Sequence, residues 1–486
     1  MLLHPTALPG PQASGDLGAA AHAFVDQLAA AGQSLWQVLP LGPTGFGDSP
    51  YQSFSAFAGN PVMVSAASLH EAGLISAADV TSVPQGEGAS ADFGAAMRGA
   101  RHIAASLSAA LARAEHREAL ERFRSSNPWL NDFTLFMALR DAHEHVAWLE
   151  WPEPLRLREP LALEQARRSL AEPIRRHEAM QWAFARQWSE LRVRARASGV
   201  ELFGDAPIFI SLDSADVWAR PELFLLDAAH RPTAVAGVPP DYFSATGQLW
   251  GNPLYRWEAH AAEDFAWWRA RIGHLATQVD RVRLDHFIGF VRHWEVPADA
   301  LDAQVGAWRD GPGEALFLAL ARELGGLPLV AEDLGEAGAD VEALRDRFGL
   351  PGMRVLQFAF DGDLKHPFLP RNLVEHCVAY TGTHDNDTTR GWWATLGEHE
   401  RRFAREQLGA TSGDIAWDLI HAGLASRADT FVTPMQDVLS LDSEARFNTP
   451  GVPSGNWTWR LAEGQWAPKL VARLREATAS TGRLRR

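Results

Sequence analysis

Val-Asp-Arg-Val-Arg-Leu-Asp-His, at residues 279–286, has the length of one buried β-strand and ends beside a carboxylate, Asp285. Apolar runs of this kind, bounded by polar or glycine residues, predict buried parallel strands. Two later runs have the same form: Leu-Val-Ala-Glu-Asp-Leu-Gly (329–335), with Glu332, and Val-Ala-Tyr-Thr-Gly-Thr-His-Asp-Asn (378–386), with Asp385. A charge at the exit of a strand gains no packing energy. Because the carboxyl ends of parallel strands share one edge of a sheet, we expect these acids to converge.

Convergent carboxylates suit glycosyl transfer, which uses a nucleophile, an acid/base and a group that stabilises positive charge. Arg283 lies on the same side of its strand as Asp285, and its charge favours the ionised form that a nucleophile needs. The apolar run before Glu332 and the acids near it are expected to raise the pKa of this carboxyl, as suits a proton donor. Asp385, with His384 beside it, is a candidate for holding sugar hydroxyls.

Each acid also has a structural alternative. Asp285 and Arg283 can form an ion pair that only stabilises the end of a strand. Glu332 and Asp333 can cap the next helix, and the run around Asp385 can be a polar loop. The functional interpretation therefore rests on the occurrence of all three acids at strand ends.

Eight strand-like runs are spread along the chain: Leu2–His4, Leu35–Leu39, Leu202–Asp205, Val279–Asp285, Leu329–Glu332, Val355–Phe358, Val378–Thr383 and Thr430–Pro434. Helical patterns at 313–324 and 337–348 lie between the later runs. This alternation predicts parallel strands joined by right-handed crossovers. Eight such units predict an α/β fold, a closed (β/α)8 TIM barrel with inserted, mainly helical subdomains and an active site at the carboxyl ends of its strands.

Two intervals are too long for simple crossovers in what we expect to be a single catalytic barrel spanning residues 1–486. Residues 60–199, between the second and third strands, are rich in Ala, Arg, Glu and Leu at helical spacing, which predicts a helical insertion. Residues 211–260, after the third strand, hold many Gly, Pro and aromatic residues. This composition predicts an insertion that forms a lid loop.

Composition and charge exclude several classes of function. The formal net charge of −15 argues against a nucleic-acid partner. No membrane span or secretory signal is visible, and the single cysteine, Cys377, fits a reducing compartment, so we expect a cytoplasmic protein. The only lysines are Lys365 and Lys469, and neither follows a phosphate loop, which excludes Schiff-base enzymes and P-loop NTPases. The His-Glu-His run at 143–145 lacks the spacing of a zinc site, so we expect no metal and no cofactor.

Two segments, 49–52 and 239–257, combine aromatic rings with Asp and Gln side chains. Sugars present apolar faces that stack on rings and hydroxyl edges that bond to polar side chains, so this mixture fits a glycan ligand. Aromatic residues are more often part of the core, and this is what we expect for the tryptophans on helical segments.

In combination, these motifs resemble the 4-α-glucanotransferases of the amylomaltase (disproportionating enzyme) type, a retaining family related to the α-amylases. The likeness extends nearly from end to end and rests on these motifs: Leu-Leu-His-Pro-Thr (2–6), Trp-Gln-Val-Leu-Pro-Leu-Gly-Pro-Thr (36–44), Asp-Ser-Pro-Tyr-Gln-Ser (48–53), Gly-Asp-Ala-Pro-Ile-Phe (204–209), the segment 237–257, Arg-Leu-Asp-His (283–286), Ala-Glu-Asp-Leu-Gly (331–335), Thr-Gly-Thr-His-Asp-Asn (381–386) and Asn-Thr-Pro-Gly (448–451). The resemblance implies Asp285 as nucleophile, Glu332 as acid/base and Asp385 as transition-state stabiliser. It also implies sugar contacts from these residues: Tyr51, Asp205, Asp241, Gln248, Trp250, Arg283, Phe358, His384 and Asn456.

The mechanism that the resemblance implies is double displacement through a covalent glycosyl intermediate. Its partners would be α-1,4-glucans and maltooligosaccharides as donors, and glucans or glucose as acceptors. Transfer and hydrolysis share the catalytic residues and differ in water exclusion, and we expect the aromatic loop 242–257 to favour the sugar acceptor. An α-glucan hydrolase, a non-catalytic glycan-binding barrel and a divalent-metal barrel enzyme are the alternatives. A monomer is one option for the oligomeric state.

Overall fold

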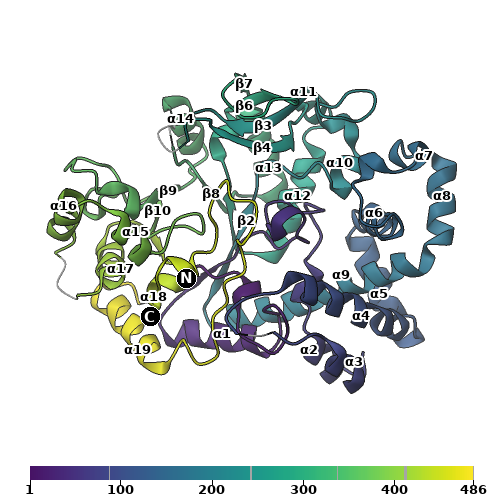
Figure 1. The fold of residues 1–486 in the computed structure, drawn as a ribbon, viewed down its shortest axis with the longest axis horizontal. Helices are drawn as coiled ribbons and strands as arrows, with labels where there is room; N and C mark the ends of the chain where they lie inside the picture. Colours follow the sequence, from purple (N-terminus) through teal and green to yellow (C-terminus); the bar gives the residue numbers. More distant parts are fainter. Residues whose placement is uncertain (87, 241–243, 336–337, 410–412, 485–486) are drawn as a thin grey trace.

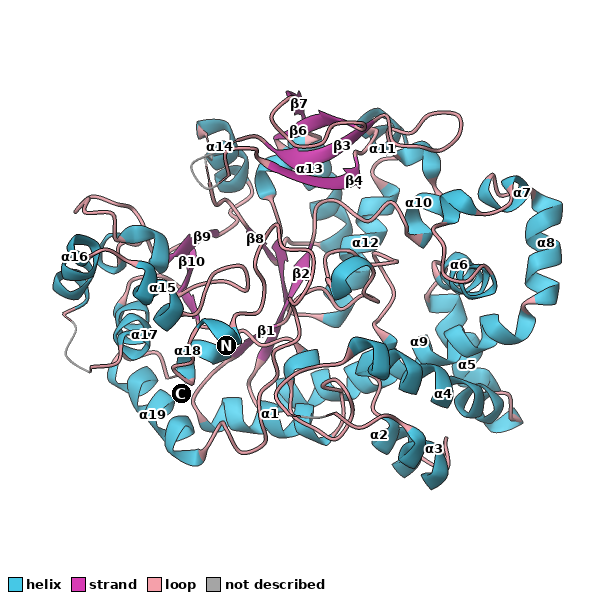
Figure 2. Ribbon diagram, viewed as in Figure 1, coloured by secondary structure: helices cyan, strands magenta, loops and turns pink. Residues whose placement is uncertain are grey.

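The computed structural model describes residues 1–86, 88–240, 244–335, 338–409 and 413–484. Its central sheet is parallel and curved, and its strands follow the order β1, β2, β5, β8, β9, β10, β11. These strands are β1 Leu35–Gln37, β2 Glu201–Ala206, β5 Arg281–Leu284, β8 Leu329–Ala331, β9 Gly352–Val355, β10 Cys377–Tyr380 and β11 Thr430–Val432. They are short and lie at the centre of the molecule, surrounded by helices (Figure 2).

Leu2 closes the barrel between the two edge strands β1 and β11. It forms parallel bridges with Gln37 on one side and Pro434 on the other. The Leu2 amide donates to the carbonyl of Thr433 (2.9 Å), and the Leu3 amide donates to the carbonyl of Gln37 (3.1 Å). The first expected strand is thus reduced to a bridge, but it occupies the eighth place around the ring. The predicted (β/α)8 barrel is confirmed.

The strand expected at Val355–Phe358 was placed three residues too late. Strand β9 ends at Val355, where Val355 pairs with Tyr380 of β10, and the chain then turns into a 3-10 helix at Leu356–Ala359. The apolar run continues from the strand into this helix, and Leu356 is buried like the strand residues before it. Periodicity alone therefore does not mark the end of the strand.

Helices fill most of the interval between β1 and β2. They are α2 Ala66–Glu71, α3 Ala77–Ser82, α4 Phe93–Leu111, α5 Arg117–Ser126, α6 Leu130–Ala142, α7 Glu153–Arg156, α8 Pro160–Ser169 and α9 Ala171–Ala197. In Figure 1, α4 to α8 lie to the right of the barrel. Helix α9 packs against α1 (Ala19–Ala30) and α12 (Ala266–Gln278), so it also serves as the crossover helix that leads into β2.

A second, antiparallel sheet lies above the barrel in Figure 1, in the order β4, β3, β6, β7. Its strands are β3 Ala234–Val238, β4 Gln248–Pro253, β6 Arg292–Pro297 and β7 Ala307–Asp310. Residues 211–260 are therefore not only a loop, because they contain helix α10 (Ala215–Ala219) and two of these strands. The sequence did not reveal them because β3 pairs with β6, and β4, two α-helices and β5 lie between these two strands in the chain.

The remaining helices are α11 Trp257–Ala262, α13 Gly313–Leu324, α14 Ala339–Arg347, α15 Thr389–Thr395, α16 Glu398–Leu408, α17 Ile415–Ala425, α18 Met435–Val438 and α19 Pro468–Ser480. Helix α13 has the bounds that its sequence pattern predicts. It stops where Gly325 takes a left-handed conformation (φ 65°), which favours glycine because it has no Cβ. Among the described residues, no helix combines the length and apolar character needed to cross a membrane.

Candidate active site

Two of the three predicted acids continue the hydrogen-bond pattern of the barrel just beyond the last residue of their strands. The Asp285 amide donates to Ala206 (3.0 Å), and the Glu332 amide donates to Leu284 (3.0 Å). Asp385 lies five residues beyond β10, in a turn that Thr383 and Asn386 hold through their side chains. All three acids thus stand at the carboxyl edge of the barrel, where enzymes of this fold have their active sites.

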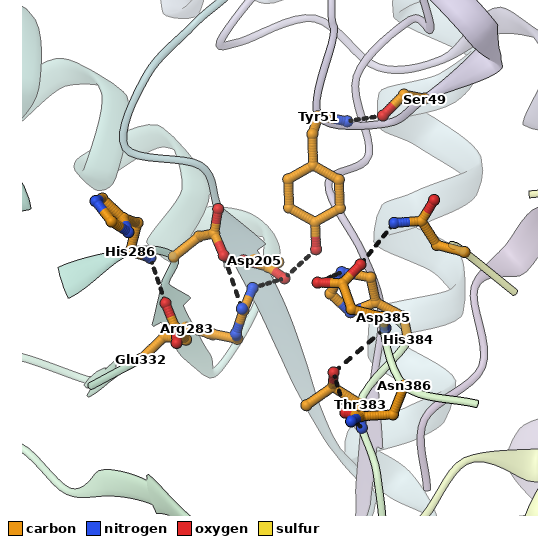
Figure 3. A network of polar contacts seen from close by, with 12 residues as sticks. Ser49, Tyr51, Asp205, Arg283, His286, Glu332, Thr383, His384, Asp385 and Asn386 are labelled. Carbon is orange, nitrogen blue, oxygen red and sulfur yellow. Dashed lines mark hydrogen bonds and ion pairs between the residues drawn. The ribbon is translucent and has the colours of Figure 1, made fainter. Parts of the chain in front are cut away.

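Arg283 connects Asp285 to a second carboxylate deeper in the barrel. Its Nη2 lies 2.7 Å from Oδ1 of Asp285, and its Nη1 donates to Oδ2 of Asp205 (2.7 Å). Figure 3 shows the guanidinium of Arg283 directed toward Asp205. Burial lowers the pKa of Arg283, but the two carboxylates outweigh it and raise this pKa well above its ordinary value. Arg283 therefore stays charged beside Asp285.

Asp205 and Arg283 lie beneath the site instead of at its surface. The side chain of Asp205 is 0% exposed and that of Arg283 is 4% exposed, whereas that of Asp285 is 26% exposed. The resemblance implies a direct sugar contact for both residues. In this arrangement the side chain of Asp205 has no exposed surface for such a contact. Arg283 contacts the Asp285 carboxylate directly, and Asp205 is connected to it through Arg283. The sugar contacts of both residues stay predictions.

Glu332 has the electrostatic setting of a proton donor. Burial is the main cause that raises its pKa, from 4.5 to about 8; Arg283 opposes this shift and Asp285 adds to it. Two backbone amides hold the carboxyl: His286 donates to Oε2 (2.7 Å) and Leu334 donates to Oε1 (3.2 Å). These bonds also lower the pKa, but not enough to cancel the effect of burial. Near neutral pH, Glu332 carries its proton.

The amide that reaches Glu332 comes from a residue in an unusual backbone conformation. His286 has φ 53°, in the left-handed region that few side chains adopt. Its ring meets Trp250 of β4 at a centroid distance of 4.8 Å and an interplanar angle of 82°. Burial lowers the pKa of His286 to about 4, so its imidazole is neutral at pH 7.

Asp385 is held by residues that come much later in the chain. Asn448 donates from Nδ2 to Oδ1 of Asp385 (2.6 Å), and Arg446 donates from Nη2 to the main-chain oxygen of Asp385 (2.6 Å). His384 Nε2 lies 3.3 Å from Oδ2 of Asp385. Sequence reasoning did not select Asn448 or Arg446. The only sequence signal for Asn448 is its place at the start of the Asn-Thr-Pro-Gly motif.

Tyr51 joins the two halves of the site. Its hydroxyl donates to Oδ2 of Asp205 (2.8 Å), and its ring stacks on His384 with a centroid distance of 5.2 Å and an interplanar angle of 13° (Figure 3). Trp457, which sequence reasoning missed, lies 5.9 Å from the ring of Tyr51 and 6.0 Å from that of His384. Tyr51 and His384 were predicted from separate motifs, and the structure brings their rings into contact.

The other predicted contact residues take different positions. Gln248 accepts from Nε1 of Trp250 (3.2 Å), and Phe358 is 40% exposed in the 3-10 helix after β9. Asn456 uses its amide within its own loop, where it bonds to the backbone of Thr449 in both directions. Asp241 lies outside the described residues. Within the described part of the chain, no group of His, Cys, Asp and Glu side chains is arranged to hold a metal ion.

A closed barrel of this kind, with three acids in separate environments at its carboxyl edge, defines a barrel enzyme of the glycoside-processing class. Residues 3–465 match the family model Glyco_hydro_77, described as 4-alpha-glucanotransferase, and the chain belongs to this family. It is 49% identical to the 4-alpha-glucanotransferase of Thermus thermophilus, over 100% of this chain and 98% of that one. It is 43% identical to the 4-alpha-glucanotransferase of Synechocystis sp., over 99% of this chain and 97% of that one.

A solved structure agrees with this assignment. The amylomaltase from Streptococcus agalactiae, in complex with acarbose, superposes with a TM-score of 0.97 at 37% sequence identity. The match covers 99% of each chain. The amylomaltase from Corynebacterium glutamicum shares the fold with a TM-score of 0.76 at 18% identity.

Proposed function

We propose that this protein is a 4-α-glucanotransferase that moves α-1,4-glucan segments to the 4-hydroxyl of an acceptor glucan or of glucose, with retention of configuration. The observation that carries the assignment of roles is the contrast between two neighbouring acids. Arg283 keeps Asp285 beside a positive charge, and burial keeps Glu332 protonated near neutral pH. One acid is thereby prepared as a nucleophile and the other as a proton donor.

In the first step, Glu332 donates its proton to the glycosidic oxygen while Asp285 attacks the anomeric carbon. The C–O bond to the leaving glucan breaks, its electron pair stays on the leaving oxygen, and the glucosyl unit becomes an ester of Asp285. Asp385 faces the ring hydroxyls and stabilises the positive charge that develops on the sugar. This role fits its side chain, which is 42% exposed beside the buried His384.

In the second step, the ionised Glu332 removes a proton from the 4-hydroxyl of the acceptor sugar. The acceptor oxygen attacks the anomeric carbon and releases the carboxylate of Asp285. Arg283 is again its ion-pair partner, 2.7 Å away. The enzyme returns to its starting protonation state, because Glu332 has given one proton and taken one back.

Sugar contacts are proposed for three partly exposed residues, Tyr51, Gln248 and Trp250, and for His384, whose side chain is 4% exposed. Tyr51 and Trp250 offer rings, and His384 and Gln248 offer polar atoms. Asp205 and Arg283 act from below by holding Asp285. The contact of Asp241 remains a proposal from the resemblance alone.

Transfer requires that a sugar hydroxyl, and not water, meets the glycosyl ester. We assign this exclusion to the aromatic segment that contains β4, because Trp250 packs on His286, the residue next to Asp285. This proposal treats residues 1–486 as one catalytic barrel, with 60–199 as a helical insertion and 211–260 as an insertion above the site. The buried thiol Cys377 suits a cytoplasmic enzyme, and a monomer is the simplest assembly for it.

Incubation with maltotriose tests the proposal. The expected products are glucose and maltodextrins longer than maltotriose, and Asp285→Asn should abolish both. Glucose and maltose without longer chains would instead identify an α-glucan hydrolase. Full activity after chelation and dialysis is expected as well, and its loss would favour a metal-dependent enzyme.

A further inference from the structure

Each of the three acids has its own partner, and the partner of Asp385 comes from a distant segment. Arg283 holds Asp285 from the same strand, and the backbone of His286 holds Glu332 from the neighbouring strand exit. Asp385 is bonded instead by Asn448, which follows β11. This third partner belongs to no barrel strand and was not part of the predicted site.

The loop that carries Asp385 does not fix its carboxylate by itself. The Asp385 amide bonds to Oγ1 of Thr383 (3.3 Å), which places the backbone but leaves the side-chain torsions free. Nε2 of His384 lies 3.3 Å from Oδ2 of Asp385, whereas the described residues of this loop give Oδ1 no donor, and the side chain is 42% exposed to water. A carboxylate that stabilises a transition state must be held in its working orientation before the reaction begins. That orientation needs another donor.

Residues 446–448 supply this donor from a well-anchored backbone. The Asn448 amide donates to the carbonyl of His384 (3.1 Å), which aligns the two segments side by side. Arg446 donates from Nε to the carbonyl of Asn448 (2.7 Å) and from Nη2 to that of Asp385. Phe447 is buried and its ring packs against Trp457 (5.6 Å). The side chain of Asn448 therefore extends from an anchored backbone, and its Nδ2 lies 2.6 Å from Oδ1 of Asp385.

We propose that Asn448 is a positioning residue for Asp385, and that Arg446 supports it by fixing the backbone on both sides of this contact. The inference rests on the proposed function, because it assigns Asn448 a part in the same glycosyl transfer. The side chain of Asn448 donates to Oδ1 of Asp385. Oδ2 of Asp385, which lies near His384, is left to face the sugar. An amide suits this task because it donates a hydrogen bond without adding a charge next to the positive transition state.

Two substitutions test the role. In Asn448→Ala the donor is lost, and we expect kcat for maltotriose disproportionation to fall about ten- to a hundredfold, as for a lost hydrogen bond to a charged group. KM should change by less than about threefold, because the contact acts in the transition state. In Asn448→Asp two carboxylates face each other and share a proton, so activity relative to the unchanged protein should be highest at acidic pH and fall as pH rises.

Asn372→Asp is the matched control. The side-chain amide of Asn372 donates to the carbonyl oxygens of Leu364 and His366 and not to a carboxylate, and Asn372 precedes the first residue of β10, Cys377. Its kcat and pH profile should equal those of the unchanged protein. Circular dichroism and thermal unfolding of all variants separate a loss of folded protein from a loss of rate.

The outcomes separate this inference from the proposed function. If the unchanged protein fails to lengthen maltotriose, the proposed function fails. If it does lengthen maltotriose but folded Asn448→Ala and Asn448→Asp keep its kcat and pH profile, the positioning role alone is overturned. A loss of activity that only follows the loss of folded protein also overturns it, since that would be a structural role.

Discussion

Nη2 of Arg283 lies 2.7 Å from Oδ1 of Asp285, and this contact depends on a third residue that solvent does not reach. Asp205, which is opposite Arg283 in the register of β2 and β5, holds the other end of the guanidinium. Removing one member of a buried ion pair leaves the other member uncompensated. The stability of the barrel and the orientation of Asp285, the proposed nucleophile, are therefore linked through Arg283.

Asp205→Asn should lower both stability and rate. We expect the free energy of unfolding to fall by about 3 kcal/mol, at the lower end of the range for a broken buried pair because Asp285 remains as a partner. The kcat should fall as well, since Arg283 loses one of its two anchors. Urea unfolding and maltotriose kinetics measure the two effects. Glu201→Gln is the control: Glu201 pairs with Arg281 (2.9 Å) on the same two strands, but partly exposed, and its loss should cost less than about 1 kcal/mol.

The pKa of Glu332 predicts how activity depends on pH. Because burial raises this pKa to about 8, the proton-donor form persists through neutral pH and the rate of the first step should fall as pH rises through about 8. If the rate already falls as pH rises from about 4 to about 5, near the ordinary pKa of a glutamate, the assignment of Glu332 as proton donor is contradicted. Rate profiles measured with a donor whose leaving group needs no proton should lose this limb.

Stability should change with pH in the same region. The folded state binds the Glu332 proton more tightly than the unfolded chain does, so this group stabilises the fold below its ordinary pKa of 4.5. That contribution is lost as pH rises from 4.5 to about 8. In Glu332→Gln this loss of stability with rising pH should disappear. The difference in unfolding free energy between the variant and the unchanged protein should therefore vary between pH 4.5 and about 8. Equal pH dependence in both proteins would show that Glu332 titrates normally.

His286 is expected to tolerate glycine better than a β-branched residue. Its φ of 53° is accessible to glycine and strained for valine, while either substitution keeps the backbone amide that bonds to Glu332. His286→Gly should therefore keep the high-pH limb of the rate profile. His286→Val should lower the thermal midpoint and move that limb, because its backbone pulls the amide away from Oε2. Identical behaviour of the two variants would mean that the backbone conformation has no role.

Trp250→Ala should reduce the ratio of transfer to hydrolysis. Trp250 packs on His286 beside the proposed nucleophile, so its removal admits water. The measurement compares longer maltodextrins with newly formed reducing ends. Trp308→Ala is the control, because Trp308 is exposed on edge strand β7 of the same small sheet. An unchanged ratio in Trp250→Ala would remove β4 from the explanation of transfer.

The barrel and its three acids could be predicted because their signals are local. Asp285 and Glu332 follow directly on apolar strands, and the strand order follows from the alternation of strand and helix. Val355–Phe358 was misplaced because the strand and the 3-10 helix after it are both apolar. The small sheet was missed because β3 pairs with β6, and β5 and other elements separate these two strands in the sequence.

The contact between Arg283 and Asp285 could also be predicted, because the two residues alternate along one strand. The contacts that come from distant segments could not. Asn448 is 63 residues from Asp385 in the chain, and the two meet only because the segment after β11 runs beside the exit of β10. Burial decides the place of Asp205 beneath the site, and burial depends on every element packed around it. A motif identifies such residues as important without saying whether they touch the substrate or another side chain.

The bridge at Leu2 also determines when the active site can be completed during synthesis. Its partners Thr433 and Pro434 leave the ribosome more than four hundred residues later, so the ring stays open while most of the chain is made. Asn448 emerges later still. A nascent chain can therefore display all three acids and still have neither a closed barrel nor a fixed Asp385, until the segment from Thr433 to Asn448 has been translated.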